Sequence, residues 1–174
     1  SFLIVIDSLK ASSVDRVNKT IQITDTGIHP GSGVGNTRKE ISEQTLKIPV
    51  IAIGVPTVVD VSTIVSDTID MLLNHLSYIK SNFAKNKLIV NQFSNYKDKI
   101  KNSNNLTEEE KKYLLGALGE LDEDKKRALF EEVLNRFNYN LIVTPKEIDY
   151  LIEKLSDIIS SALNNALHPS INNY

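Results

Sequence analysis

Two short apolar runs decide the fold class of this chain: FLIVI at Phe2–Ile6 and PVIAIGV at Pro49–Val55. Both are rich in β-branched residues and lack polar alternation, which is typical of strands covered on both faces. A sheet that is buried on both faces needs helices to cover it. The two runs therefore predict an α/β fold, in which helices pack on a central sheet.

Helical periodicity supplies the covering elements. Apolar residues recur at helical spacing over residues 57–76 and 122–137, and LTEEE carries a capping box at Thr107 and Glu110. A further helix is predicted after TPKE, with Thr144 as N-cap and Glu147 three residues later. The inner face of the 122–137 helix is expected to hold Leu129, Phe130, Val133, Leu134 and Phe137. The last helix has the broadest apolar stripe, which comprises Ile148, Leu151, Ile152, Leu155, Ile158, Ile159, Ala162 and Leu163.

Two shorter segments read as strands, TIQIT at residues 20–24 and LIV at residues 141–143. Residues 80–105 are rich in asparagine and weakly periodic, so we expect a surface insertion or a partly helical excursion there. A length of 174 residues fits one domain, and we expect residues 1–174 to form a single α/β domain. The chain opens directly on a core-grade apolar run, which indicates a C-terminal piece of a longer protein.

Composition argues against several classes of protein. The net charge is −2, which disfavours nucleic-acid binding. There is no cysteine, so a disulfide framework and a thiolate metal site are excluded. No apolar run approaches the ~20 residues of a membrane span. Neither a metal nor a cofactor is called for by any motif in the sequence.

The segment DTGIHPGSGVGNTRKE, residues 25–40, holds four of the seven glycines of the chain. Its glycines fit neither the dinucleotide-binding fingerprint nor the Walker phosphate-binding loop. Three interpretations remain: a backbone nest for phosphate, a turn that needs positive φ angles, or the rim of a substrate cleft. The cleft interpretation assigns the rim to Gly27, His29, Gly31, Ser32, Gly33, Gly35 and Asn36.

Asp7 is the leading candidate for a catalytic residue, because it follows the run FLIVI and sites in α/β sheets lie beyond the carboxyl ends of strands. The alternative is an aspartate that caps a helix at Ser8–Val17. Asp25, after the strand TIQIT, is a weaker candidate. If the two strands are antiparallel, the two aspartates lie at opposite ends of the sheet and cannot share a site. Of the histidines, His29 is a possible site residue, whereas His75 and His168 are expected at helix ends.

Long stretches of the sequence resemble the germination protease family of spore-forming bacteria. They include VDRVNKTIQITDTGIHPGSGVGNTRKEIS, IPVIAIGVPTVVD, LGALGELDEDKKRALFEEVL and NLIVTPKEID. The resemblance runs in order along nearly the whole chain, apart from about residues 77–105.

This resemblance implies an endopeptidase that begins the degradation of small acid-soluble spore proteins during germination. It further implies a zymogen and a homotetramer in the spore core, which is cytoplasmic. The implied fold resembles that of the hydrogenase maturation endopeptidases, with three layers, α/β/α, around a mixed sheet. Of the two aspartates implied as catalysts, one aligns with Asp7, and the other belongs to residues outside this chain.

The segment DSLKASS departs from the letters that the family usually has. Ser8 and Lys10 stand in place of alanines, and Ser12 in place of an arginine. These departures leave a second hypothesis open, in which the chain is a non-catalytic relative, or a C-terminal module for binding or assembly. A third hypothesis, a phosphate- or nucleotide-binding domain, rests on the glycine-rich loop alone.

Overall fold

The computed structural model describes residues 1–31, 38–83, 100, 103, 106–139 and 141–168. The chain folds into two compact units. The first unit comprises Ser1–Asp60 and Leu141–Tyr174, and the second comprises Val61–Asn140. None of the helices in the described ranges combines the length and the hydropathy that crossing a bilayer requires.

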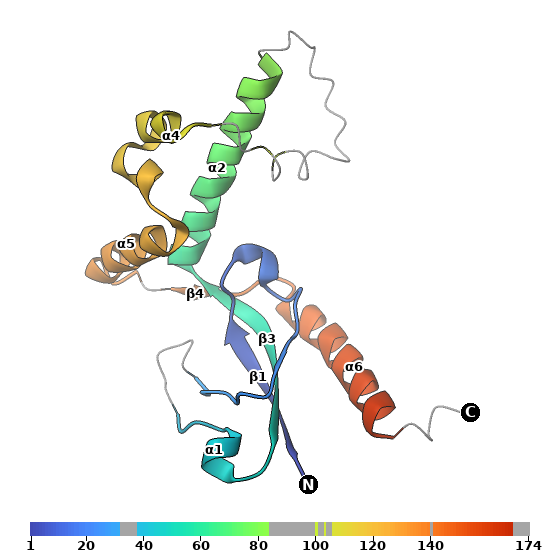
Figure 1. Cartoon of the computed structure of the whole chain (residues 1–174). Helices are drawn as coiled ribbons and strands as arrows, with labels where there is room; N and C mark the ends of the chain where they lie inside the picture. The colour runs from blue at the N-terminus through green and yellow to red at the C-terminus, as the bar shows by residue number, and fades with distance from the viewer. Residues whose placement is uncertain (32–37, 84–99, 101–102, 104–105, 140, 169–174) are drawn as a thin grey trace. The chain divides into compact units, whose positions relative to one another are not determined.

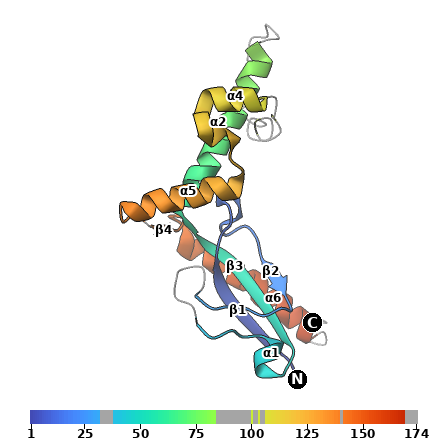
Figure 2. The ribbon, with the colours of Figure 1, turned by 60° about the vertical axis from the view of Figure 1, so that its left-hand side comes forward.

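The first unit is built on a four-stranded mixed sheet (Figures 1 and 2). β1 (Leu3–Lys10) pairs in parallel with β3 (Val50–Asp60), and β2 (Gln22–Thr24) pairs antiparallel with β3 on its other side. β4 (Ile142–Val143) is antiparallel to the last two residues of β3. The predicted α/β class with a mixed sheet is confirmed.

β1 and β3 both run further than their apolar runs predict. The ladder continues beyond Asp7, where Ser8 pairs with Val55 and Leu9 with Pro56. Asp7 therefore lies inside the strand, opposite Gly54, and the alternative that it caps a helix is wrong. A glycine is required at position 54 because the Leu9 side chain occupies the place where a Cβ would lie.

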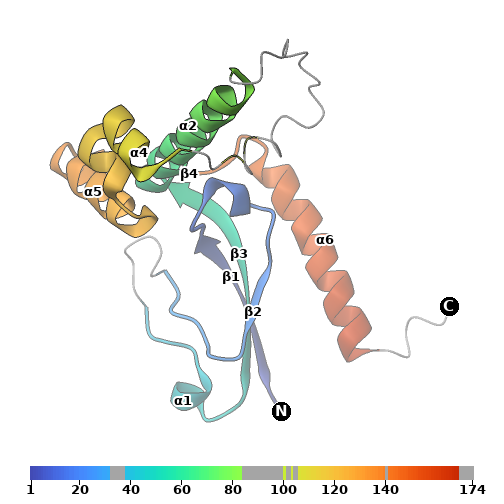
Figure 3. The same ribbon diagram turned by 45° about the horizontal axis from the view of Figure 1, so that its top comes forward.

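α6 (Ile148–Leu167) covers one face of this sheet (Figures 1 and 3). Ile159 is buried against Ile53 and Val55, and Ile4, Leu155 and Leu163 pack around them. Full burial of an aliphatic side chain of this size contributes roughly 1.5–3 kcal/mol. The predicted apolar stripe thus holds the helix on the sheet, although Ile152 and Ile158 remain about half exposed.

The predicted cap of α6 is wrong. Its N-cap is Glu147, which makes no side-chain capping bond. Thr144 lies further back, where its Oγ1 donates a hydrogen bond to the carbonyl oxygen of Thr57 in β3 at 3.0 Å. The Thr144 side chain therefore makes a tertiary contact with β3 instead of the capping bond that the local pattern predicts.

Between β2 and β3 the chain forms a loop and the short helix α1 (Glu43–Leu46). The loop is closed by an antiparallel bridge, in which the backbone N–H groups of Ile28 and Ile41 each donate to the other's carbonyl at 2.9 Å. Inside the bridge, the N–H of Arg38 donates to the carbonyl oxygen of Pro30 at 3.0 Å. The glycine-rich segment is therefore anchored at its base.

The described residues of the second unit form α2 (Val61–Phe83), α4 (Glu108–Leu115), the 3₁₀ helix η4 (Gly116–Glu120) and α5 (Glu123–Arg136). α2 begins later than predicted because β3 continues through Asp60, and His75 lies within it rather than at its end. The capping box of Thr107 and Glu110 is confirmed: Glu110 N–H donates to Thr107 Oγ1 at 3.2 Å, and Thr107 N–H to Glu110 Oε2 at 2.9 Å.

One prediction for this unit needs correction, and another stays a prediction. Residues 80–83 continue α2, and most of the remaining segment to residue 105 lies outside the described residues, so the expected insertion stays a prediction. On α5, Leu129, Val133 and Phe137 are exposed, whereas Phe130 and Leu134 are half-buried. The polar side chains described below, rather than a continuous apolar stripe, hold α5 against α2.

Candidate functional site

Asp7 lies on β1 with a half-buried side chain. Its Oδ1 accepts a hydrogen bond from the backbone N–H of Ser8 at 2.9 Å. The N–H of Leu3 donates to Pro49 of the β3 side at 2.9 Å, so the odd-numbered amides of β1 point toward β3 and the even-numbered ones away from it. The bond to Ser8 therefore turns the Asp7 carboxylate toward the outer edge of β1.

A cavity of about 430 Å³ lies beside Asp7, between the sheet and α6. Asp7 is the one carboxylate among its lining residues in the described part of the chain. The lining is otherwise apolar, with a few hydroxyl groups, and it comprises Ile6, Asp7, Ser8, Val55, Thr57, Ile152, Leu155, Ser156, Ile159, Ser160 and Leu163. Side chains alternate along a strand, and Ile4, Ile6 and Ser8 are the β1 residues on the α6 side, so Asp7 borders this cavity at the strand edge while its side chain starts from the other face of the sheet. An apolar cavity with a few polar groups is the usual form of a small binding site.

Ser8 and Lys10, which follow Asp7 and depart from the family pattern, both contact residues of β3. Ser8 Oγ shares a short hydrogen bond with Thr57 Oγ1 at the floor of the cavity. Lys10 Nζ forms an ion pair with Asp60 Oδ2 at 2.9 Å. Ser8 and Lys10 thus tie β1 to β3, and the Lys10 ammonium is directed to Asp60 rather than to Asp7.

Asp25 lies apart from Asp7. Thr24, the residue before it, pairs with Ala52, and β2 runs antiparallel to β3 on the side of β3 opposite to β1. Asp25 lines a different cavity of about 510 Å³, together with Thr26, Ser42, Glu43, Gln44 and Lys47. The antiparallel alternative therefore holds, and the structure does not bring the two candidate aspartates into one site.

The described part of the glycine-rich segment shows two glycines at positive φ, Gly27 at +91° and Gly31 at +76°. A Cβ on Gly27 would lie 2.5 Å from the carbonyl oxygen of Ile41 and 2.6 Å from the Cβ of Ser42. The close packing of the loop base accounts for Gly27 without a ligand. His29 is exposed, while the predicted rim residues Ser32, Gly33, Gly35 and Asn36 lie outside the described residues.

Sequence reasoning missed the contribution of α6 to the cavity. Ser156 and Ser160 lie one helical turn apart, and their hydroxyl-bearing side chains line the cavity next to the apolar stripe. Serines at this spacing beside a buried stripe were the available signal. Thr57 was missed because β3 continues past the apolar run that predicts it.

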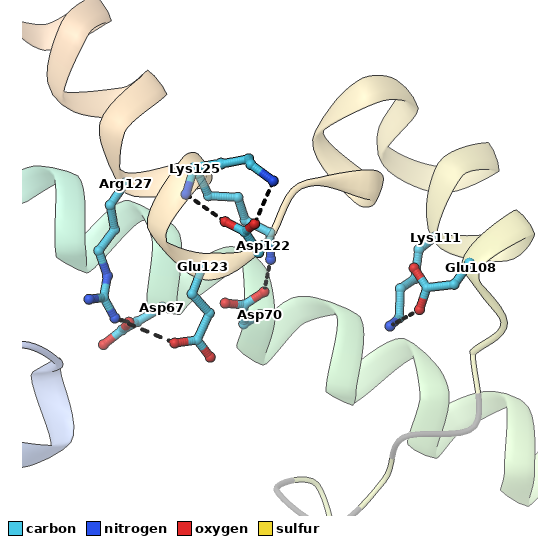
Figure 4. Close-up of polar contacts among 9 residues, drawn as sticks. Asp67, Asp70, Glu108, Lys111, Asp122, Glu123, Lys125 and Arg127 are labelled. Atoms are coloured by element: carbon cyan, nitrogen blue, oxygen red, sulfur yellow. Dashed lines mark hydrogen bonds and ion pairs between the residues drawn. The ribbon is translucent and has the colours of Figure 1, made fainter.

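The second unit holds a polar cluster of a different kind, at the junction of α2 and α5 (Figure 4). The buried side chain of Lys126 forms an ion pair with Asp70, and Arg127 lies 4.0 Å from Asp67 and 3.6 Å from Glu123. A cavity of about 650 Å³ beside it is lined mainly by charged and polar residues, including Asp70 and Lys126. These ion pairs join the two helices, and this accounts for the cluster structurally.

Among the described residues of this unit, two carboxyl groups have lowered pKa values. The pKa of Glu110 is lowered by hydrogen bonds from the Lys80 side chain and from the Thr107 backbone. The pKa of Asp122, the N-cap of α5, is lowered mainly by its hydrogen bonds with Lys125, and the pKa of Lys125 is raised in turn. Asp122 and Lys125 are exposed and Glu110 is partly exposed, and all three groups act at helix starts.

Comparison with known proteins assigns the chain to a family. Residues 1–174 match the family model described as germination protease. The chain is 52% identical over 173 residues to a germination protease of Bacillus cereus (strain G9842), and 49% identical over 172 residues to one of Bacillus velezensis. Each alignment covers 98% of this chain and 47% of the relative, so the chain spans about half the length of the curated relatives it matches.

Proposed function

This chain belongs to the germination protease family, and on that premise we propose that it forms part of an endopeptidase in which Asp7 is one of two catalytic carboxyl groups. The observation that carries the proposal is the position of Asp7 on β1, beside an apolar cavity of about 430 Å³. The substrates that we propose are the small acid-soluble spore proteins, from the resemblance described above.

The proposed chemistry needs two carboxyl groups that share one proton. The ionised carboxylate takes a proton from a water molecule, whose oxygen attacks the scissile carbonyl carbon, while the protonated carboxyl group donates a hydrogen bond to the carbonyl oxygen. The tetrahedral intermediate then collapses: the C–N bond breaks, and the leaving amine takes a proton from the carboxyl pair. Asp7 suits one of these roles, because the Ser8 N–H orients its Oδ1 and leaves Oδ2 without a partner among the described residues. The second carboxyl group would come from the part of the family's chain that this one does not span.

The cavity suits an apolar side chain of the substrate. Its walls of Val55, Leu155 and Ile159 offer apolar contact, and the hydroxyls of Ser156 and Ser160 lie on α6 at the same cavity. Hydroxyl groups beside an apolar wall can hydrogen-bond the backbone of a peptide whose side chain is buried.

The finer fold and the setting follow from the same resemblance. We propose a three-layer arrangement like that of the hydrogenase maturation endopeptidases, which the mixed sheet and α6 support in part. We also propose a homo-oligomer, made as a zymogen, in the cytoplasm of the spore core.

Cleavage of a small acid-soluble spore protein by the full-length protein and its Asp7→Asn variant tests the catalytic role. The substitution keeps the size of the side chain and removes its acid–base function. A loss of about a hundredfold or more in kcat is expected, the range for loss of a general acid–base group. Near-parental cleavage by Asp7→Asn, in a variant with unchanged circular dichroism, would refute the role of Asp7.

Asp25→Asn provides the comparison, because Asp25 lines a separate cavity on the far side of β3. We expect this variant to keep most of the parental kcat. If Asp25→Asn loses activity while Asp7→Asn keeps it, the catalytic assignment moves to Asp25. If the parental full-length protein cleaves nothing, the non-catalytic hypothesis gains support.

A further inference from the structure

The outer edge of β1 has no neighbouring strand among the described residues. In the described part of the chain β1 pairs with β3 alone, and the sheet order β1-β3-β2 places β1 at one end. The outward-pointing backbone groups are those of Ile4, Ile6 and Ser8, by the alternation of a parallel ladder. Among the described residues, the Ser8 N–H alone has a bond there, to the carboxylate of Asp7.

Over Leu3–Ile6, β1 has none of the devices with which proteins normally protect the end of a sheet; its charged residues and its register shift, between Leu9 and Lys10, come later in the strand. Such edges are short, or carry proline, bulges or inward charges. β2, at the other end of the sheet, follows this rule because it has three residues. β1 has eight residues, of which the first four, LIVI, are apolar. The sequence of this first half is that of an interior strand.

The apolar surface next to this edge is also uncovered. Ile6 is 54% exposed and Phe2 50% exposed. Across the cavity from Ile6, Ile152 of α6 is 46% exposed. A further strand beside β1 would cover Ile6 and give Ile4 and Ile6 backbone partners.

We propose that a strand from the half of a full-length germination protease chain that is not spanned here pairs with the outer edge of β1. The length of the relatives supports this occupant, since this chain covers only 47% of them while 98% of it aligns. The remaining residues are covalently linked to this chain in such a protein, so their effective concentration at the edge is high. Neighbouring strands lie about 4.8 Å apart, so the added strand would bring its own side chains close to the Asp7 carboxylate.

This inference deepens the proposed function, because it says which edge the rest of the chain meets. Its test uses backbone protection and stability, not cleavage. The edge of β1 can be paired even in a protein whose Asp7 has no catalytic role. Failure of strand pairing and failure of the catalytic assignment are therefore distinguishable.

Amide hydrogen exchange of the full-length protein, resolved to single residues, is the decisive measurement. The amides of Ile4 and Ile6 are the probes, because the Ser8 amide is already bonded to Asp7. We expect them to exchange at least about a hundredfold more slowly than amides of exposed loops, as is usual for interior strands. Fast exchange at Ile4 and Ile6, with Val5 and Leu9 protected, would overturn the proposal. So would protection that appears only as the protein concentration rises, because two copies of the chain would then be pairing.

Two matched substitutions provide the second readout. Ile6 and Ile23 both pair with Ile53, from opposite sides of β3, and both are exposed in this chain. In the full-length protein Ile6→Lys should lower Tm clearly more than Ile23→Lys, because an added strand buries only Ile6. Equal effects of the two substitutions would contradict pairing at the β1 edge.

Discussion

Gly27 shows at the scale of one residue how the glycine-rich segment is held. Its φ of +91° is unfavourable for a residue with a side chain, and its Cα lies against the backbone of Ile41 and Ser42. The adjacent Ile28–Ile41 bridge fixes this approach with two hydrogen bonds of 2.9 Å. Both requirements, the dihedral angle and the lack of space, act at one position.

Replacing Gly27 with alanine should therefore destabilise the protein. A left-handed conformation costs a residue with a Cβ roughly 1–2 kcal/mol, and the overlap with Ile41 and Ser42 adds to this cost. We expect the free energy of unfolding, measured by urea denaturation, to fall by about 2 kcal/mol or more in Gly27→Ala.

Gly116→Ala is the control for this substitution. Gly116 also has positive φ, at +58°, but a Cβ there would meet nothing within 4 Å. It reports the backbone cost without the overlap, so its effect should be smaller. A Gly27→Ala loss no larger than that of Gly116→Ala would show that the base of the loop relaxes freely.

The site could be anticipated from sequence only for residues with a strong local signal. Asp7 stood out because a carboxylate follows an apolar run. Its surroundings did not, because Thr57, Ser156 and Ser160 reach the cavity through strand pairing and the docking of a helix. Pairing partners far apart in the chain, such as Ser8 and Thr57, leave no trace in a single sequence.

At the scale of elements, the start of α4 combines a local cap with a tertiary ion pair. Glu110 accepts from the Thr107 N–H at 2.9 Å and, on the same carboxylate, from Lys80 of α2 at 2.5 and 2.7 Å. These donors lower the pKa of Glu110. The cap of α4 and its attachment to α2 therefore depend on one ionised group.

This arrangement predicts a pH dependence. A carboxyl group whose pKa is lowered on folding stabilises the fold above its ordinary pKa, and the contribution is lost as pH falls through the lowered pKa. In Glu110→Gln the fall in unfolding free energy between about pH 5 and about pH 2 should be shallower than in the parent. Denaturant unfolding at a series of pH values measures the slope.

Glu109→Gln is the matched control, because Glu109 is exposed in the same helical turn. It removes the same formal charge but leaves the bonds between Thr107 and Glu110 in place. Its unfolding free energy should therefore depend on pH much as that of the parent does. Equal slopes for Glu109→Gln and Glu110→Gln would mean that net charge, and not the cap, sets the acid response.

Elements were predicted best where the signal was local. The Thr107 capping box was found from its spacing, and the stripe of α6 from its periodicity. The prediction of a Thr144 cap was wrong because the Thr144 hydroxyl bonds to β3. The predicted start of α2 was too early because residues 57–60 belong to β3. In both cases a contact with a distant strand outweighed the local preference.

At the scale of the whole molecule, the chain has two compact units with different kinds of interior. The first is held by apolar packing of α6 on the sheet. The second relies on charged contacts such as the buried Lys126–Asp70 pair between α5 and α2. We expected a single domain from the sequence, although charged residues are concentrated in residues 108–136, which belong to the second unit.

Removal of Lys126 should act mainly on the second unit. Lys126→Ala leaves Asp70 partly buried without its cation, and the loss of one partner of a buried pair costs several kcal/mol, here reduced to about 2 kcal/mol because Asp70 is 30% exposed. Hydrogen exchange measured by mass spectrometry should become faster in α2 and α5, with β1 and β3 little changed.

Lys125→Ala tests whether burial is the cause. Lys125 pairs with Asp122 at 2.7 Å, but both side chains are more than half exposed. Exposed pairs add little to stability, so exchange in α2 and α5 should stay near the parental rate. A uniform increase along the whole chain in Lys126→Ala would show instead that the two units unfold together.

The contact of Leu9 with Gly54 has a consequence for how this sequence can diverge. Any side chain at position 54 would need the space that Leu9 fills, so a substitution there is tolerated only if position 9 becomes smaller in the same lineage. Positions 9 and 54 are therefore expected to evolve as one unit.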